Sequence, residues 1–402
     1  MTDDLNPQRE PNTSAGPASF CLRPKRRSDA AQDDEATAGG TSFSMAEARH
    51  IVRDLFTPNP WIYWTDFLLS FGVGLVCYGL VRKVPGWSLL QAGLFLTSCI
   101  CFFRASLFVH EIVHFRTGSF RVFRFVWNLI CGIPFLVPSF TYYTHLDHHR
   151  RKFYGTKEDG EYLPLGHQTP WHILFYLSQT LVIPGVVVLR FLVLTPLTWF
   201  VPPVRRLVHQ RLSSLVMDPT YIRPLPARDV LRIWRIQEFG CFLFCATVGV
   251  LLIRGMQPGA DPAGPFPVRR GVLPMGFLVQ AYLTGMMIVF LNAVRTLGAH
   301  RFLNDGREMT FVEQLVDSVN YPRRPLITGL WAPIGLRFHA LHHLFPAMPY
   351  HNLAAAHRRL INELPANSPY RLTVGDSLIV SLWQLWLASR RLRAEKLASL
   401  PS

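Results

Sequence analysis

The stretch HLDHHRRKFYGTKEDGEY, residues 145–162, places three histidines within its first five residues and three basic residues directly after them. On a helix, the first histidine would lie one turn from the other two, so that all three could approach one point. A neutral imidazole is a good ligand for first-row metal ions. A single run of this kind is equally typical of a solvated polar patch, so its meaning depends on the rest of the chain.

Two other stretches have related spacing. HEIVH, residues 110–114, places two histidines four residues apart on one helix face, and HALHH, residues 339–343, repeats the spacing of HLDHH. A further histidine, His300, ends the stretch NAVRTLGAH, where Asn292 and Thr296 share its helix face and could supply an oxygen or hold a water. The nine candidate metal ligands are His110, His114, His145, His148, His149, His300, His339, His342 and His343.

The composition indicates an integral membrane protein. Of the 402 residues, 49% are apolar and only 17% are charged, and the mean hydropathy is +0.18. The formal net charge of +15 is typical of proteins that bind either nucleic acid or an anionic membrane surface. With this much apolar sequence, we expect contact with a membrane and none with nucleic acid.

Four apolar segments are suitable for membrane-spanning helices, because about twenty apolar residues cross the hydrocarbon core. They are residues 61–81, 87–109, 239–253 and 272–294. The third segment is short and needs help from its flanking residues. Residues 125–143, 171–202 and 326–336 are also apolar, but they are short or contain proline. We interpret these three as interfacial or re-entrant, with 171–189 as an alternative span.

The order of these segments predicts an all-α membrane protein with about four transmembrane helices in two hairpins. The hairpin loops, residues 82–86 and 254–271, fall on one side and hold five of the 41 basic residues. By the positive-inside rule, the remaining and more basic segments face the cytoplasm. Two complete spans separate the second histidine stretch from the third, so all the candidate ligands fall on that same side. The histidines can therefore share one cytoplasmic cap.

Nine imidazoles exceed the four ligands that close a zinc site. They suit two ions, each with four or five nitrogen ligands and with positions left open. Such a centre is richer in nitrogen than the carboxylate-dominated di-iron sites of helical bundles. The sequence therefore predicts a histidine-rich di-metal centre in the cap.

The chain divides by composition into three parts. Residues 1–45 are rich in small, polar and charged residues, and we predict that they are disordered. Residues 46–365 hold the spans and the histidine stretches and form the membrane-bound domain. Residues 366–402 are predicted to form a C-terminal amphipathic helix or tail.

The three histidine boxes, HxxxH, HxxHH and HxxHH, spread over paired transmembrane hairpins, resemble the membrane-bound fatty acid desaturase and hydroxylase superfamily over roughly residues 55–365. The segment HHLFPAMPYHNLAAAHRRL is similar to the segment after the third box in acyl-lipid desaturases. HEIVH, and HLDHH followed by YGTKEDGEYLP, are similar to the sphingolipid desaturases of the superfamily.

This resemblance implies two non-heme iron ions, O2 and two electrons that together oxidise an unactivated methylene of a long acyl chain. Loss of a second hydrogen would give an alkene, whereas oxygen rebound would give an alcohol. We therefore expect an acyl-lipid or sphingolipid-type desaturase. The alternative is a lipid hydroxylase, a ketolase or a terminal-alkene-forming oxidase of the same superfamily.

This chain departs from the family at one position. Where the family has a water-bridging Asn four residues before the additional histidine, here His300, this chain has Thr296, with Asn292 one turn earlier.

The resemblance also implies a separate electron donor, namely a ferredoxin, a rubredoxin or a b-type cytochrome, because no HPGG heme-binding signature is present. A basic patch after the second box could dock an acidic donor, hold lipid phosphates or be solvated. The patch consists of Arg150, Arg151 and Lys152. Four acidic residues near the boxes could orient imidazole N–H groups. They are Glu111, Asp147, Asp159 and Glu161.

Two other classes of protein fit part of the pattern. HEIVH also matches HExxH, the zinc-protease signature with Glu111 as general base, and would indicate one zinc ion in an intramembrane metalloprotease. That interpretation leaves both HxxHH runs without a role. A transporter or a metal-storage scaffold would place histidines within the spans, whereas these histidines lie at or beyond the ends of the spans.

Overall fold

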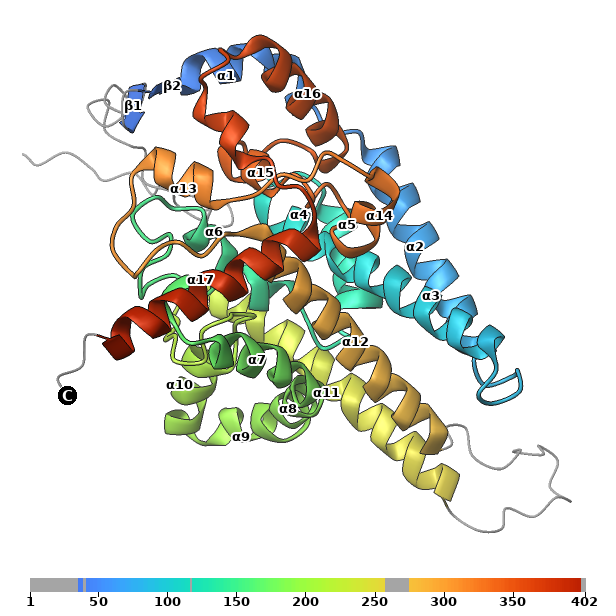
Figure 1. The fold of residues 1–402 in the computed structure, drawn as a ribbon. Coiled ribbons are helices and arrows are strands. Elements are labelled where there is room, and N and C mark those ends of the chain that lie inside the picture. Colours follow the sequence, from blue (N-terminus) through green and yellow to red (C-terminus); the bar gives the residue numbers. More distant parts are fainter. Residues whose placement is uncertain (1–34, 39–40, 116–117, 257–274, 399–402) are drawn as a thin grey trace, which may run out of the picture.

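The computed structural model describes residues 35–38, 41–115, 118–256 and 275–398. These residues are mostly helical, which confirms the all-α fold (Figure 1). Four long helices dominate the architecture: α2 Pro60–Leu80, α3 Leu89–Ser106, α11 Arg228–Met256 and α12 Met275–Ala299. In Figure 1 they slant in the same direction, as two pairs, α2 with α3 and α11 with α12.

The four long helices confirm the four expected spans, since each is long and apolar enough to cross a membrane. α3 continues almost without interruption into α4 Phe108–His114, so the first histidine box extends the second span. α11 begins at Arg228, which supplies the length that residues 239–253 lack. Residues 272–274 of the fourth expected span lie outside the described residues.

The starts of α2 and α3 are fixed by capping side chains. The Asn59 carboxamide oxygen accepts the N–H of Trp61 at 3.0 Å, and Pro60 occupies the first helical position, where no N–H is needed. The Ser88 hydroxyl accepts the N–H of Gln91 at 3.1 Å in the same way. The first hairpin therefore turns between residues 81 and 88, as the sequence predicts.

A charged pair joins α2 to α3. The Arg104 guanidinium donates two hydrogen bonds to the Asp66 carboxylate, at 2.6 and 2.5 Å, and the Tyr350 hydroxyl donates a third at 2.7 Å. An unpaired charge in a span is costly, but a bidentate ion pair satisfies both groups. This pairing explains how two charged residues are accommodated in apolar helices.

A fifth helical segment also meets the length and composition of a membrane span, which differs from the expected interfacial role. It runs through α8 Ile183–Leu189, the π-helical turn η6 Arg190–Leu194 and α9 Thr195–Phe200. In Figure 1 this segment runs across the direction of the four long helices. The alternative span 171–189 is broken instead into α7 Pro170–Ser178, η5 Gln179–Leu181 and α8.

The charge in this fifth segment is buried and paired. Arg190 is 2% exposed and forms an ion pair with Glu238 of α11, which is 1% exposed. Its guanidinium also donates to the hydroxyls of Thr195 at 2.7 Å and Ser213 at 3.0 Å. The sequence alone did not reveal this pair, because its two members are far apart in the chain.

Glu238→Ala is expected to lower the free energy of unfolding by about 3–5 kcal/mol, because it leaves a buried guanidinium without its carboxylate. Thermal unfolding of the purified protein in detergent measures this loss. Asp305→Ala is the matched control, since it removes a largely exposed carboxylate that lies 4.0 Å from Arg307. Equal stability of the two variants would contradict the proposed importance of the buried pair.

The remaining helices are short, with one exception at the C-terminus. The α-helices are α1 Met45–Ile51, α5 Arg121–Trp127, α6 His145–His148, α10 Pro202–Arg211, α13 Phe311–Asp317, α14 Pro325–Trp331, α15 His339–Leu344, α16 Leu353–Glu363 and α17 Leu378–Ala398. The other helical turns are η1 Arg53–Phe56, η2 Asn128–Gly132, η3 Ser139–Tyr142, η4 Leu165–His167, η7 Tyr350–Asn352 and η8 Pro369–Thr373. Most of them gather at one end of the four long helices (Figure 1).

Two apolar stretches form short helices, as the interfacial interpretation expects. Residues 125–143 break into α5, η2 and η3, and Trp127 and Phe140 are buried there. Residues 326–336 begin within the single short helix α14, whose Leu326 side chain is 88% exposed. Neither stretch forms a helix long enough to span.

A short hairpin lies within the segment predicted to be disordered. Strands β1 Glu35–Ala38 and β2 Thr41–Ser44 pair antiparallel, and α1 follows directly. The Phe43 ring is buried, and its centroid lies 5.7 Å from that of Phe311. This contact packs the hairpin against α13. Residues 1–34 and 39–40 of the predicted tail lie outside the described residues.

The main hydrophobic core lies beneath the histidine boxes. It includes aromatic side chains of the first hairpin and its continuation, such as Phe67, Phe108 and Phe123, whose rings pack 5.5–5.6 Å apart. Leu341 of α15 and Leu360 of α16 are buried in the same core. The first and third boxes are therefore fixed against one rigid body.

Candidate metal centre

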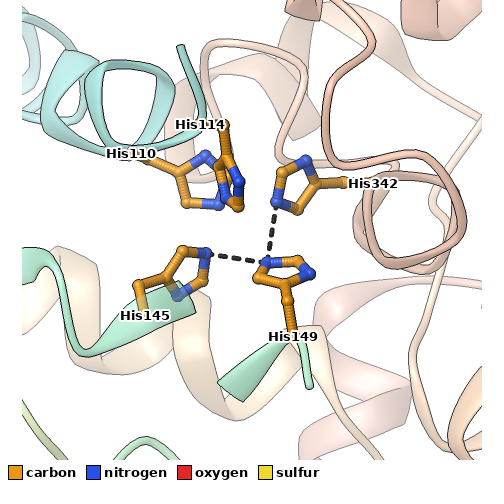
Figure 2. A group of neighbouring side chains, drawn as sticks. All are labelled: His110, His114, His145, His149 and His342. Carbon is orange, nitrogen blue, oxygen red and sulfur yellow. Dashed lines mark hydrogen bonds between the residues drawn. The ribbon is translucent and has the colours of Figure 1, made fainter. Parts of the chain in front are cut away.

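The structure brings all nine predicted histidines together, in two groups. Within each group, one ligand atom from every residue lies within 4.8 Å of the others. The first group, shown in Figure 2, contains His110, His114, His145, His149 and His342. The second group contains His148, His300, His339 and His343. The sequence predicted these nine residues as candidate ligands, and the structure adds how they divide into two groups.

The division follows helical geometry. In HLDHH and in HALHH, the first and last histidines join one group and the middle one joins the other. Residues i and i+4 are about 40° apart around a helix, whereas i+3 and i+4 are about 100° apart. Each HxxHH box therefore faces two points, and the expectation that its three histidines converge on one point is wrong.

The spacing of the nitrogens fits a shared ion. Within the first group, the Nε2 atoms of His145 and His149 are 3.0 Å apart, as are those of His149 and His342 (Figure 2). Two nitrogens that each lie about 2.1 Å from one ion, at a right angle, are about 3.0 Å apart.

The second group has the same spacing. The Nε2 atoms of His339 and His300 lie 2.9 Å apart, and those of His343 and His339 lie 3.0 Å apart. Both groups therefore hold their nitrogens as close as ligands of one metal ion.

Several of these nitrogens are buried without a hydrogen-bond partner among the described residues. Both ring nitrogens of His110 and the Nε2 of His114 are examples. A buried polar atom of this kind is costly unless something binds it. A metal ion placed within each group would satisfy such atoms, so the residues present fit a di-metal centre.

Burial keeps most of the imidazoles neutral, which is the form that binds metal. It is the largest cause that lowers the pKa of His145, His149 and His342 well below the usual range, with neighbouring histidines adding to the effect. Burial is also the largest single cause acting on His148, but the charge and hydrogen bond of Asp159, together with the charges of Glu161 and Asp317, outweigh it and raise the pKa of that histidine.

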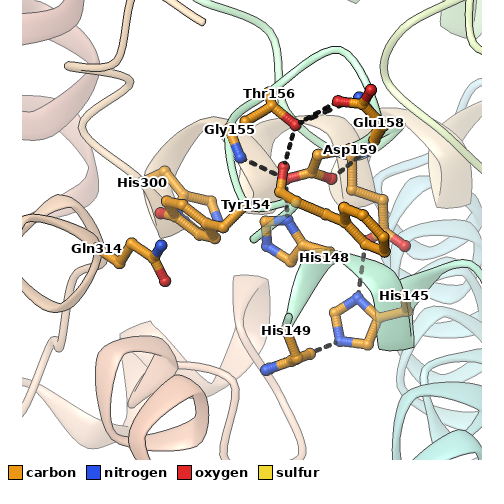
Figure 3. A network of polar contacts seen from close by, with 12 residues as sticks. His145, His148, His149, Tyr154, Gly155, Thr156, Glu158, Asp159, His300 and Gln314 are labelled. Carbon is orange, nitrogen blue, oxygen red and sulfur yellow. Dashed lines mark hydrogen bonds and ion pairs between the residues drawn. The ribbon is translucent and has the colours of Figure 1, made fainter. Parts of the chain in front are cut away.

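Two of the four predicted acidic partners hold histidines of the second box. The Nδ1 atom of His148 lies 2.7 Å from Asp159 Oδ2 (Figure 3), and that of His145 lies 2.8 Å from Glu161 Oε2. A carboxylate accepts at Nδ1–H, which leaves Nε2 as the nitrogen that is free to bind a metal. Asp159 also accepts the backbone N–H of Gly155 at 2.9 Å, which fixes the loop after the box.

A third buried carboxylate was missed from the sequence. The Tyr154 hydroxyl lies 2.8 Å from His300 Nδ1 and donates to Asp317 Oδ2 at 2.7 Å. The tyrosine therefore accepts from the His300 ring and transmits the charge of Asp317 to it. Asp317 lies far from every box in sequence and no spacing rule points to it. The stretch FVEQLVDSV, residues 311–319, contains two acidic residues, Glu313 and Asp317, and nothing in its pattern marks Asp317 as the buried one.

Glu111 lies beside the centre, but its carboxylate binds two tyrosine residues and does not orient an imidazole. Its Oε2 accepts the Tyr63 hydroxyl at 2.6 Å and the backbone N–H of Tyr350 at 3.3 Å. Its Oε1 lies 3.9 Å from His110 Nδ1, too far for a hydrogen bond. Because Glu111 is held in this way and both histidines of HEIVH belong to a group of five, the structure disfavours the zinc-protease interpretation.

Asp147 does not orient a histidine, and this prediction is wrong. Its carboxylate lies 2.8 Å from Arg150 Nη1, and both side chains are partly exposed. On the helical turn α6, Asp147 is adjacent to His148 in sequence but points to the outside.

The basic patch of Arg150, Arg151 and Lys152 is exposed, as a docking surface requires.

Asn292 and Thr296 bind a buried arginine and not a histidine. Arg295, which is 5% exposed, donates to Asn292 Oδ1 and to Thr296 Oγ1, each at 3.1 Å. The Thr296 hydroxyl in turn donates to the Asn292 carbonyl at 2.9 Å. The expected oxygen ligand near His300 is therefore not supplied directly by either side chain. The role of Arg295 was missed from the sequence, although its charge lies in an apolar helix.

Comparison with known proteins supports the superfamily inferred from the boxes. A family model described as fatty acid desaturase matches residues 85–374. The ceramide hydroxylase of Caulobacter vibrioides is 38% identical over 366 residues, which cover 89% of this chain and 97% of that relative. No solved structure matches the chain. With three histidine boxes in place and a family match over most of its length, the chain belongs to the fatty acid desaturase family, within the membrane-bound desaturase and hydroxylase superfamily.

Proposed function

We propose that the protein is a membrane-bound, O2-dependent di-iron hydroxylase that acts on the long alkyl chain of a ceramide or a related sphingolipid. The family and the relative point to an oxidoreductase that modifies lipid. The observation that carries the proposal is the near-complete alignment with a ceramide hydroxylase, on a chain whose nine imidazoles form two groups that could each hold a metal ion.

Two iron ions bound by the two groups would activate O2, so that hydrogen can be removed from an unactivated methylene. For hydroxylation, R–H, O2, two electrons and two protons give R–OH and water. The chain's own role is positional. Asp159, Glu161 and the pair Tyr154–Asp317 hold the imidazoles, and burial keeps water away from the ligands.

Desaturation, the first expectation from the sequence, is the second candidate. The description of the matching family supports it, whereas the relative supports the alternative of hydroxylation. Both reactions use the same centre, O2 and two electrons, and desaturation releases two waters. The histidine positions cannot separate them, because the outcome depends on whether a second hydrogen or an oxygen is transferred.

The electrons are proposed to come from a separate ferredoxin, rubredoxin or b-type cytochrome. The exposed patch of Arg150, Arg151 and Lys152 lies on the loop that follows the second box, and this loop also carries Tyr154 and Asp159. A basic surface attracts an acidic partner.

We further propose that the centre faces the cytoplasm. This proposal rests on the uneven distribution of basic residues between the two sides of the membrane.

Lipid analysis separates the candidates. The protein is expressed with an electron donor in a host that makes ceramide but does not hydroxylate it, and ceramides are measured by mass spectrometry. We expect ceramide that gains one oxygen atom, which carries the label when heavy-isotope O2 is supplied. Ceramide that loses two hydrogen atoms would establish the desaturase instead. Unchanged ceramide, despite full iron loading and a working donor, would exclude ceramide as the substrate.

A further inference from the structure

A polar cavity outside the metal centre lies where α9, α10 and α11 meet. Its volume is about 180 Å³. It is lined by Thr198, Trp199, Arg205, His209, Arg235 and Glu238. None of these residues belongs to either histidine group, and the proposed reaction uses none of them.

The charges around this cavity favour an anion. Glu238 is the one carboxylate among the lining residues, and its charge is offset by the buried ion pair with Arg190. Arg205 and Arg235 remain, so the cavity has an excess of positive charge. A guanidinium matches the geometry of phosphate and is less strongly hydrated than an ammonium.

Two of the lining residues, His209 and Arg205, each have a nitrogen that makes no hydrogen bond to the described residues. His209 is 3% exposed, and its Nε2 makes no hydrogen bond, although it lies 3.5 Å from Glu238 Oε1. Arg205 is fixed by donating from Nε to the Thr198 carbonyl at 2.7 Å and from Nη2 to the Trp199 carbonyl at 3.0 Å. These bonds leave its Nη1 free of the backbone.

Arg235 completes the donor set from α11. It is exposed, and within the described residues it has no hydrogen bond or ion pair. A buried imidazole nitrogen that makes no hydrogen bond among the described residues, beside one fixed and one unpaired guanidinium, indicates that the cavity is built for a bound group.

The surroundings of the cavity identify the source of that group. The side chains of Phe200 and Ile236 are 81% and 72% exposed, and those of Trp199 and Phe239 are 38% and 52% exposed. The Trp199 and Phe239 ring centroids are 6.1 Å apart. Aromatic and basic residues at the end of apolar helices are typical of the membrane interface, where lipid phosphates lie.

We propose that this cavity binds the phosphate of an anionic membrane phospholipid, whose acyl chains lie along the exposed apolar side chains of α9 and α11. Arg205, Arg235 and His209 supply the donors. The lipid would join the fifth helical segment to α11, on the side where the Arg190–Glu238 pair already connects them. This binding does not depend on the proposed reaction, because it is measured without turnover.

The test uses the purified, iron-loaded protein in detergent and follows its thermal unfolding. Dioleoylphosphatidylglycerol is compared with dioleoylphosphatidylcholine and with inorganic phosphate. We expect phosphatidylglycerol to raise the unfolding temperature most. Arg235→Gln should weaken this binding about tenfold, because it removes a charged donor. Arg232→Gln is the matched control, since Arg232 is exposed on the same helix but does not line the cavity.

Arg235→Gln removes an exposed side chain, so its unfolding temperature without lipid should equal that of the unmodified protein. An equal lipid response of this variant and the unmodified protein would overturn the proposal. An equal response to phosphatidylcholine would show that the charge is not recognised, and an equal response to inorganic phosphate would show that no lipid is required. Either of these results would also overturn it.

Discussion

His148→Ala is expected to abolish product formation and to lower the bound iron from two ions to one per chain. His148 belongs to the group of four, so its removal leaves three imidazoles for that ion. Both ions are needed for the proposed chemistry, and the loss of one is sufficient to stop turnover. The ion in the group of five should remain, because none of its ligands is changed.

Iron content and lipid analysis on the same preparation measure this result. His172→Ala is the control, since His172 is exposed and lies outside both groups. It should keep two ions and full activity. Retention of two tightly bound ions in His148→Ala would show that this histidine is not a ligand and that the assignment of the second group is wrong.

Asp159→Asn is expected to reduce iron affinity or activity by about 10–100-fold, while leaving the protein folded. The Asp159 carboxylate lies 2.7 Å from His148 Nδ1 and is fully buried. The amide keeps the shape but removes the charge, so the imidazole becomes a weaker ligand and loses its fixed orientation. Competition with a chelator measures the affinity, and thermal unfolding reports on the fold.

Asp147→Asn is the matched control for this prediction. Asp147 belongs to the same box and is one residue from His148, but it pairs with Arg150 on the partly exposed side of α6. It should therefore bind iron and turn over like the unmodified protein. Equal losses in both variants would indicate a general effect of charge near the box and not a specific orientation of His148.

The candidate ligands could be predicted from the sequence because two local rules were sufficient. Residues three and four apart share one side of a helix, and a hairpin of two spans returns the chain to the side of the membrane from which it left. Both rules use only the positions of residues along the sequence, so the candidate ligands could be identified without knowledge of tertiary contacts. The positions of the four long helices α2, α3, α11 and α12 followed from apolar length in the same way.

The contacts around the histidines could not be predicted, because they join segments far apart in the chain. Asp317 reaches His300 through Tyr154, and Glu111 turns to Tyr63. Asp147 and Asp159 are both acidic residues near the second box, yet only Asp159 faces a histidine. Which of them points inward is decided by the turn after α6, where Asp159 also accepts the N–H of Gly155.

The fifth helical segment, residues 183–200, also could not be predicted as a span from local sequence. Arg190 and three prolines between residues 171 and 202 argue against a span when they are read locally. In the structure, Pro184 lies at the start of α8, where a missing N–H costs little, and Pro196 follows the π-helical turn η6, which interrupts the regular helical hydrogen bonds there. The charge of Arg190 is cancelled by Glu238. Both compensations depend on the folded structure.

The metal content of the purified protein tests the central claim most directly. The two histidine groups predict two iron ions per chain and no stoichiometric zinc. Elemental analysis of protein produced in iron-replete medium, with iron and zinc measured in the same sample, gives this ratio. A single zinc ion per chain would contradict the di-iron assignment and would restore the interpretation of HEIVH as a zinc site.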